Sequence, residues 1–186
     1  MTQVELDEIK QIYQEADLLF SSEQVDQAIN HMAEAISASL SEQNPVVFCV
    51  MNGGLVITGQ LLTRLNFPLE ASYLHATRYR NTTSGHSLEW KVPPMSAFRG
   101  RPVLIVDDIL DEGHTLVEIM DHCRREGASA VYAAVLIDKR HDRKAQPGLK
   151  AEFTGLEIED RYIFGYGMDY KGYWRNAPGI FAVKGL

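Results

Sequence analysis

Val103–Leu116 reads VLIVDDILDEGHTL and passes from an apolar run through a short turn into a helical pattern. Four consecutive apolar residues open it, which is typical of a strand buried on both faces of a parallel sheet. Gly113 lies in the turn, and apolar residues recur at helical spacing from Leu116 through Ile119 to Cys123. A helix that begins after such a turn presents free backbone N–H groups and the positive end of its dipole. The stretch therefore predicts an open α/β sheet with an anion-binding turn.

Three carboxylates accompany that turn. Asp107 and Asp108 follow the apolar run directly, and Asp111 comes three residues after them. Acids beside a phosphate cradle indicate that hydroxyl groups, a metal ion or a transferable proton is also handled there. An acidic pair after a strand is more often a solvated loop, and it also occurs in the acidic pocket of response regulators. That pocket begins with acids after a first strand, whereas here at least two predicted strands precede Asp107, so the order does not fit.

The rest of the chain alternates strands and helices, which favours a parallel sheet with helices on both faces. Two helices are expected first, one over about Val4–Phe20 and a second that begins at a capping box of Ser21 and Gln24. We expect one domain over residues 1–186, with a core at about 46–150 and a small hood built from the N-terminal helices and about residues 151–186. After the second helix, we predict strands at Val46–Met51, Leu69–Ala76, His86–Val92, Val103–Val106, Ala130–Ile137, Tyr162–Tyr166 and Phe181–Val183, and a helix at Leu55–Leu65.

Charge and composition are those of an acidic globular protein. The 186 residues carry 18 Lys and Arg against 25 Asp and Glu, a net charge of −7, which argues against general nucleic-acid binding. The apolar runs are too short for a membrane span, and the acidic start does not resemble a signal peptide. Cys49 and Cys123 lack metal-ligand spacing and are expected to be reduced core thiols. We therefore expect a cytoplasmic protein with small-molecule substrates and neither a nucleic acid nor a membrane as partner.

The loop Asp107–Thr115 resembles the phosphoribosyl-diphosphate loop of the phosphoribosyltransferases. In that family a hydrophobic strand precedes two acids, two apolar residues, an acid, Thr or Ser, Gly, a variable residue and Thr. The resemblance implies a parallel sheet flanked by helices, in which Asp107 and Asp108 bind the ribose hydroxyls of 5-phosphoribosyl diphosphate (PRPP). Glu112 replaces the usual hydroxyl residue, so we expect its side chain to point away from the phosphate. The residues implied to wrap the 5′-phosphate are Asp111, Glu112, Gly113, His114 and Thr115.

Other segments resemble the 6-oxopurine branch of this family, typified by hypoxanthine-guanine phosphoribosyltransferase. Asn52, Gly53 and Gly54 fall at its diphosphate turn, where Asn52 takes the place of a Lys, and Arg175 falls where a guanidinium binds diphosphate. On its own, a strand followed by two glycines is equally typical of a plain tight turn.

The purine side resembles the same branch. Lys139 falls where an ammonium donates to the 6-oxo group, Tyr162 where an aromatic stacks on the purine, and Ile163 where the backbone reads its edge. The resemblance implies Mg²⁺ as cofactor, with Asp169, Asp107 and Asp108 as its ligands. Taken singly, Tyr162 is equally typical of a core aromatic and Asp169 of a turn cap.

The mobile loop of the branch matches least well. It carries a Ser-Tyr pair, and here Arg78 and Tyr79 occupy the corresponding region. The alternative is an exposed hairpin without catalytic contact.

The resemblance implies purine salvage: Mg²⁺-dependent transfer of phosphoribose from PRPP to hypoxanthine or guanine, with Asp111 as the base that takes the purine N7 proton. A homodimer or homotetramer is implied as well. Two alternatives stay open. One is a phosphoribosyltransferase that prefers xanthine, and the other is a non-catalytic RNA-binding regulator on the same fold, which would require a local basic face.

Overall fold

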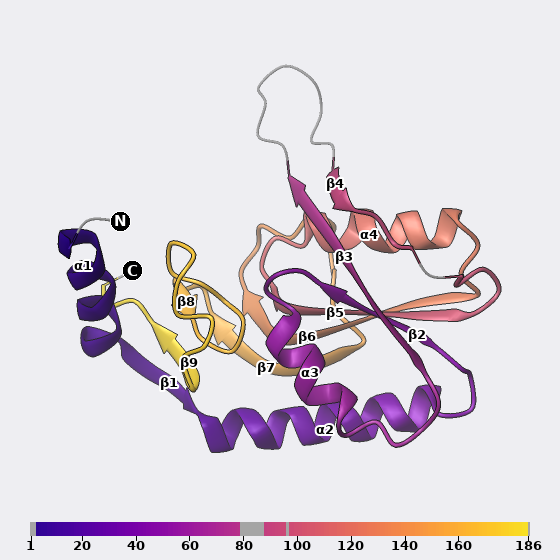
Figure 1. The fold of residues 1–186 in the computed structure, drawn as a ribbon, viewed down its shortest axis with the longest axis horizontal. Coiled ribbons are helices and arrows are strands. Elements are labelled where there is room, and N and C mark those ends of the chain that lie inside the picture. The colour runs from indigo at the N-terminus through magenta and orange to yellow at the C-terminus, as the bar shows by residue number, and fades with distance from the viewer. Residues whose placement is uncertain (1–2, 79–87, 96, 186) are drawn as a thin grey trace.

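The computed structural model describes residues 3–78, 88–95 and 97–185. Its main sheet has six strands in the order β4-β3-β2-β5-β6-β7, all parallel to their neighbours except β4, which runs antiparallel to β3 (Figure 1). The strands are β2 (Val46–Val50), β3 (Glu70–Arg78), β4 (Leu88–Val92), β5 (Pro102–Leu110), β6 (Ala130–Arg140) and β7 (Phe153–Glu159).

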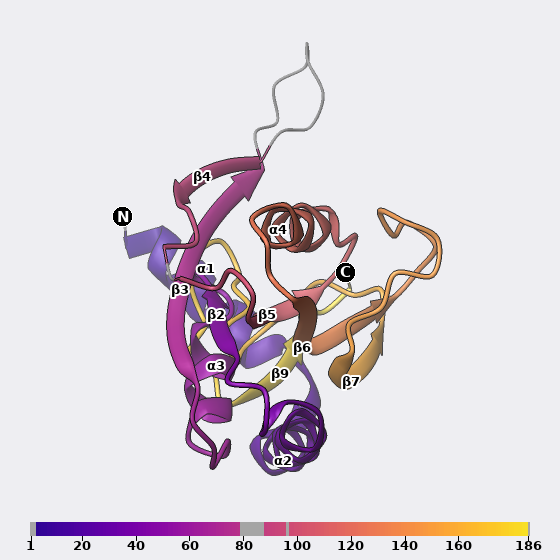
Figure 2. The same ribbon diagram turned by 90° about the vertical axis from the view of Figure 1, so that its right-hand side faces the viewer.

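Helices cover both faces of this sheet. Figure 2 shows α4 (His114–Arg125) on one face, and α2 (Ser22–Leu40) with α3 (Leu55–Leu62) on the other. Alternate residues of the central strands supply the two cores, so that Leu104 packs with the α2 and α3 side and Ile105 with the α4 side. Such double burial is what continuous apolar runs such as VLIV predict. The capping box of Ser21 and Gln24 is present at the start of α2.

The two ends of the chain form a second, smaller layer, which we call the hood. It contains α1 (Gln3–Glu15) and a three-stranded sheet in the order β1-β9-β8, made of β1 (Asp17–Ser21), β9 (Gly179–Ala182) and β8 (Ile163–Phe164). Its core joins Tyr13, which stacks on Trp174, to Phe164 and Ile9. In Figure 1, α1 and the three strands of the hood lie together at one end of the molecule.

Several boundaries differ from the expectations. The first helix ends at Glu15 instead of Phe20, because the next residues pair as β1 with β9. The strand β7 went unrecognised: it pairs with β6 and belongs to the main sheet, although residues from about 151 onward were expected in the hood. Likewise α2 packs on the main sheet. Within the ranges that the structure describes, we find no helix with the length and apolar character of a membrane span.

Two strands reach further than expected, and this extension places functional side chains. β5 continues through Asp107 and Asp108 to Leu110, and β6 continues through Lys139 to Arg140, with Leu110 opposite Asp138. Acidic and basic residues therefore leave the sheet on ordered strand ends and not on loops.

Candidate active site

A cavity of about 410 Å³ opens at the carboxyl ends of β2 and β5, the edge at which open α/β sheets bind ligands. Segments far apart in the sequence meet there, because β2 and β5 are neighbours and the C-terminal segment folds back over them. The predicted site residues that line it are Gly53, Asp107, Asp108, Asp111, Glu112, Gly113, His114, Thr115, Asp169 and Arg175.

The turn before α4 has the backbone geometry of an anion cradle. Gly113 is the N-cap of α4 and has a φ of +83°, a left-handed conformation that favours glycine. A Cβ at Gly113 would also lie 2.4 Å from a methyl carbon of Leu149, so that side chain would have to shift to accommodate a larger residue. No side-chain hydrogen bond caps the helix, and its first residues, His114 to Leu116, line the cavity, so the free N–H groups expected at a helix start are available beside it. The Glu112 carboxylate lies 3.7 Å from the His114 imidazole.

The two acids on β5 are held in an unfavourable electrostatic environment. Burial and the neighbouring charge of Asp108 raise the pKa of Asp107 well above its ordinary value, and burial also raises the pKa of Asp108. The Arg175 guanidinium acts in the opposite direction on both pKa values. The Asp108 N–H donates to Asp107 Oδ1 at 2.9 Å. Burial is thus the main reason that the charged form of each acid is disfavoured, and Arg175 offsets it in part.

Replacing Asp107 with asparagine should therefore stabilise the protein. A carboxyl whose pKa is raised by folding destabilises the native state at pH above that pKa, and this penalty disappears as the pH falls below the ordinary carboxyl value. Asparagine keeps the oxygen that accepts from Asp108 N–H. We expect urea unfolding in EDTA to show a higher midpoint for Asp107→Asn at pH 8, with the advantage shrinking at pH 4.5. Asp121→Asn, an exposed acid on α4, serves as control. A variant less stable than the parent at pH 8 contradicts this.

The C-terminal segment touches the turn after β2 at a contact that only glycines allow. A Cβ on Gly167 would lie 2.1 Å from the Gly53 carbonyl oxygen, and a Cβ on Gly53 would lie 2.2 Å from an Asp108 carboxylate oxygen. The peptide bond between Met51 and Asn52 in this turn is cis. Arg175 is fixed beside the same contact: it donates to the Gly167 carbonyl at 2.6 Å and pairs with Asp169 at 2.5 Å.

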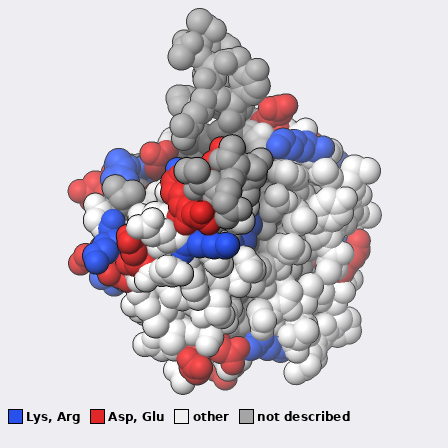
Figure 3. All heavy atoms as spheres, turned by 60° about the vertical axis from the view of Figure 1, so that its left-hand side comes forward, with Lys and Arg blue, Asp and Glu red and all other residues white. Residues whose placement is uncertain are grey.

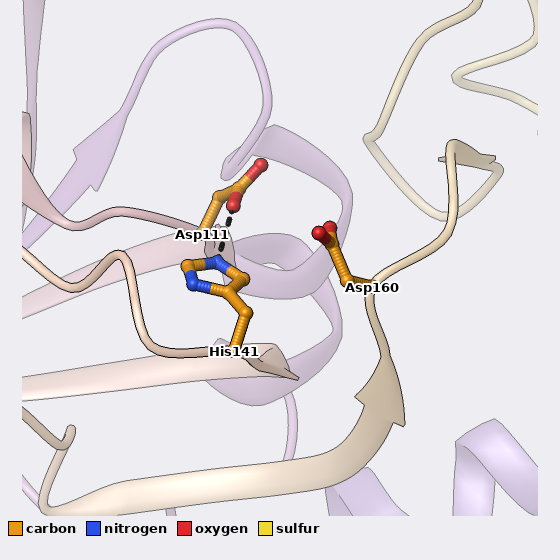
Figure 4. A group of neighbouring side chains, drawn as sticks. All are labelled: Asp111, His141 and Asp160. Atoms are coloured by element: carbon orange, nitrogen blue, oxygen red, sulfur yellow. Dashed lines mark hydrogen bonds and ion pairs between the residues drawn. The ribbon is translucent and has the colours of Figure 1, made fainter.

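A second charged cluster lies around Asp111 at the ends of β5 and β6. The Lys139 ammonium is 3.2 Å from Asp111 Oδ2 and 3.6 Å from Asp160 Oδ1, and the Lys139 side chain is only 10% exposed. His141 Nε2 is 2.7 Å from Asp111 Oδ1. Figure 4 shows the Asp111 and His141 side chains pointing toward each other, with the Asp160 carboxylate directed to the same space from a neighbouring segment. Asp111 therefore links this cluster to the cavity that it lines.

Comparison with known proteins agrees with this geometry. A family model described as "Phosphoribosyl transferase domain" matches residues 16–171. The chain belongs to the phosphoribosyltransferase family.

Relatives of this phosphoribosyltransferase match along most of their length. A protein of Tritrichomonas foetus named hypoxanthine-guanine-xanthine phosphoribosyltransferase is 29% identical over 167 residues, which cover 90% of this chain and 91% of that protein. The hypoxanthine-guanine phosphoribosyltransferase of Bacillus subtilis (strain 168) is 28% identical over 168 residues, with coverage of 90% and 92%. The crystal structure of a hypoxanthine-guanine phosphoribosyltransferase from Bacillus anthracis superposes with a TM-score of 0.81 at 28% identity, covering 89% of this chain and 96% of that one.

The other predicted site residues of this phosphoribosyltransferase that the structure describes are not among the residues that line the cavity. Asn52 is exposed and Gly54 is buried in the turn after β2. Tyr162 is 43% exposed and meets Tyr170 edge to face, and Ile163 is buried in β8. Arg78 ends β3, and Tyr79 lies outside the described residues.

Sequence reasoning missed three side chains of the phosphoribosyltransferase site. His141 and Lys144 lie in the charged stretch HDRKAQPGLK, which none of the motifs quoted above includes, and the same is true of Asp160. Their partner Asp138 lies in β6 beyond its predicted end, and Asp111 directly follows β5, which also extends further than predicted. A run of alternating basic and acidic residues directly after a core strand was the one available signal.

The residues of the phosphoribosyltransferase cavity fit Mg²⁺, the ion that the family resemblance implies. Asp107, Asp108 and Asp169 offer carboxylate oxygens, the ligand type that Mg²⁺ prefers. Burial is the main cause that raises the pKa values of Asp107 and Asp108, and a divalent cation bound between them would favour their charged forms. Asp169 already accepts from the Gly172 N–H at 2.6 Å and meets Arg175, so its remaining lone pairs are those open to a metal or its waters.

Lys144 anchors the backbone that carries Asp111. Its ammonium donates to the Leu110 carbonyl at 2.9 Å, to the Asp111 carbonyl at 2.8 Å and to Asp138 Oδ1 at 2.7 Å. The Lys144 and Asp138 side chains are only 14% and 12% exposed. The ammonium thus ties the end of β5 to the end of β6.

Replacing Lys144 with methionine should lower the free energy of unfolding by about 3 kcal/mol, because Asp138 would be left as a largely buried charge without its partner. Chemical denaturation followed by circular dichroism measures this difference. Lys150→Met, an exposed lysine of the same loop, is the control. Equal stability of the two variants would show that the Lys144 contacts contribute little.

Proposed function

We propose that this phosphoribosyltransferase transfers 5-phosphoribose from PRPP to hypoxanthine or guanine, with Mg²⁺, and forms IMP or GMP and diphosphate. The main observation in support is that one cavity brings together the acid pair of β5, the N-terminus of α4 and Arg175. Asp111 also lines this cavity and pairs with Lys139 beside it. These groups match, in order, a ribose diol, a 5′-phosphate, a diphosphate and a purine. The names of the relatives support the same reaction.

The donor half of the proposal rests on binding and charge. Asp107 and Asp108 accept hydrogen bonds from the ribose hydroxyls, and the N–H groups of the turn Asp111–Thr115 hold the 5′-phosphate. As the C1–O bond to diphosphate breaks, positive charge grows on the ribose and negative charge on the leaving group. Arg175 and the backbone of Asn52, Gly53 and Gly54 stabilise that leaving diphosphate. Mg²⁺, when bound by Asp107, Asp108 or Asp169, supplies Lewis-acid stabilisation of the same diphosphate charge.

The acceptor half of the proposal places the purine beside Asp111 and Lys139. Lys139 donates to the 6-oxo group, and Asp111 takes the proton from N7 as N9 attacks the ribose. Tyr162, two residues after Asp160, lies at the same edge and keeps 43% of its surface exposed, which leaves a ring face open for stacking. Ile163 reads the purine edge through its backbone. Arg78 and Tyr79 belong to the loop proposed to close over this centre and exclude water.

A spectrophotometric assay tests the proposal. Hypoxanthine, guanine, xanthine and adenine are each supplied with PRPP, with and without Mg²⁺. We expect nucleotide formation from hypoxanthine and guanine, little from adenine, and a strong loss of rate in EDTA. The absence of turnover with every purine would refute the proposed function, whereas turnover confined to xanthine would refute only the base preference.

Xanthine is the second candidate acceptor, because the relative from Tritrichomonas foetus carries xanthine in its name. The same assay decides between the bases. An RNA-binding role finds less support: on the face drawn in Figure 3, basic and acidic side chains of the described residues lie interspersed and form no broad basic area. Filter binding with a mixed-sequence RNA tests that alternative directly.

We further propose that the enzyme acts in the cytoplasm as a homodimer or homotetramer. Exposed apolar side chains on different parts of the described surface, such as Leu55 and Tyr73, are available for contact between copies. Sedimentation velocity at micromolar concentration tests the assembly, and a monomer throughout would refute it.

A further inference from the structure

His141 is a buried histidine whose two ring nitrogens both have defined partners. It follows the last residue of β6, and its side chain is 4% exposed. Nε2 lies 2.7 Å from Asp111 Oδ1, and the backbone N–H of Arg143 donates to Nδ1 at 3.0 Å. None of the family motifs described above includes His141.

The Arg143 contact determines which nitrogen carries the proton. A backbone N–H is only a donor, so Nδ1 must be the acceptor and the neutral ring must carry its hydrogen on Nε2. Nε2–H then donates to the Asp111 carboxylate. A proton on both nitrogens would set Nδ1–H against the Arg143 N–H. The ring is therefore built to donate to Asp111, and it has no free lone pair with which to relay a proton away from that carboxylate.

The same assignment argues against a metal at this place. Asp111, His141 and Asp160 lie close enough to share an ion. Nε2, however, carries the hydrogen that faces Asp111, and the Lys139 ammonium already lies 3.2 Å and 3.6 Å from the two carboxylates. Two cations of the chain already pair with these carboxylates, because the Arg143 guanidinium also donates to Asp160 Oδ2 at 2.7 Å.

We propose that His141 is a positioning residue that fixes the Asp111 carboxylate for proton abstraction, an inference that rests on the function proposed above. Each Asp111 oxygen has one partner: His141 holds Oδ1, and Lys139 holds Oδ2 at the longer distance of 3.2 Å. When Lys139 turns to the 6-oxo group of the purine, Oδ2 is released toward the substrate. His141 keeps Oδ1 in place, so that the free oxygen stays aimed at the N7 proton.

Kinetics of His141→Leu and His141→Gln test this role. Leucine removes the donor, and glutamine places an amide N–H at a similar reach. We expect kcat to fall about 10- to 100-fold in His141→Leu, with the KM for PRPP within about twofold of the parent. We expect His141→Gln to recover most of that loss. Arg140→Gln, which alters the exposed neighbour paired with Glu157, is the control for general disturbance of the strand end.

A double-mutant cycle separates positioning from a merely structural role. When His141→Leu is added to the Asp111→Asn variant, kcat should fall by less than about twofold further, because the carboxylate through which His141 acts is already lost. A full additional loss, or full activity of the single His141→Leu variant, overturns the proposal. An inactive parent enzyme would instead refute the proposed function.

Nitrogen-15 NMR of the histidine-labelled parent protein gives a readout that does not depend on catalysis, and the His141→Gln variant serves only to assign the His141 signal. The signal that disappears in His141→Gln should show the Nε2–H tautomer. An Nδ1–H tautomer overturns the proposal.

Discussion

Asp111→Asn is expected to lower kcat for nucleotide formation by about 10²- to 10⁴-fold, the range over which a positioned general base contributes. Asparagine keeps the shape and still accepts from His141, but it cannot take the N7 proton. Asp111 lines the cavity in the turn whose backbone N–H groups are proposed to hold the 5′-phosphate. Asparagine leaves that backbone unchanged, so the KM for PRPP should change little. Steady-state kinetics with hypoxanthine and PRPP measure both constants, and single-turnover rates separate chemistry from product release.

The matched control for Asp111→Asn is Asp142→Asn, which removes an exposed carboxylate next to His141. Its kcat should stay within about twofold of the parent. A kcat near that of the parent in Asp111→Asn would remove Asp111 as the base. A raised KM with unchanged kcat would give Asp111 a role in binding alone.

The geometry of the turn before α4, which we propose binds phosphate, could be predicted from the sequence because its signals are local. A buried strand, a glycine that tolerates positive φ and a helical apolar pattern all lie within the stretch Val103–Leu116, and the structure places them as strand, N-cap and helix. Family resemblance then pointed to distant residues, and the structure brings Gly53, Asp169 and Arg175 to the same cavity as Asp107.

The contacts that the sequence did not predict depend on packing between distant segments. β1 exists because the edge of β9 is available to it, and no pattern within Asp17–Ser21 distinguishes it from the end of a helix. The partners of Asp111 are similar: the charges of Lys139 and His141 are visible in the sequence, but their meeting point depends on how far β5 and β6 extend together.

Lys139→Met should weaken discrimination between hypoxanthine and adenine by about 10- to 100-fold in the ratio of their kcat/KM values. A hydrogen bond from a charged donor contributes about 1.5 to 3 kcal/mol, and adenine presents a 6-amino donor to the same ammonium instead of an acceptor. Methionine preserves the length and packing of this nearly buried side chain. Competition assays with both bases measure the ratio.

The ratio is the diagnostic quantity because Lys139 has a second role. Its ammonium pairs with Asp111 and Asp160. Methionine therefore also alters the surroundings of Asp111, the proposed general base, and the absolute kcat should change for every purine. An effect that passes through Asp111 acts on N7 chemistry and scales hypoxanthine and adenine alike, which leaves their ratio unchanged. An effect through the 6-position changes the ratio itself. If Lys139→Met lowers kcat/KM for hypoxanthine and for adenine by the same factor, Lys139 acts only through Asp111. Discrimination at position 6 of the purine must then come from the backbone near Ile163.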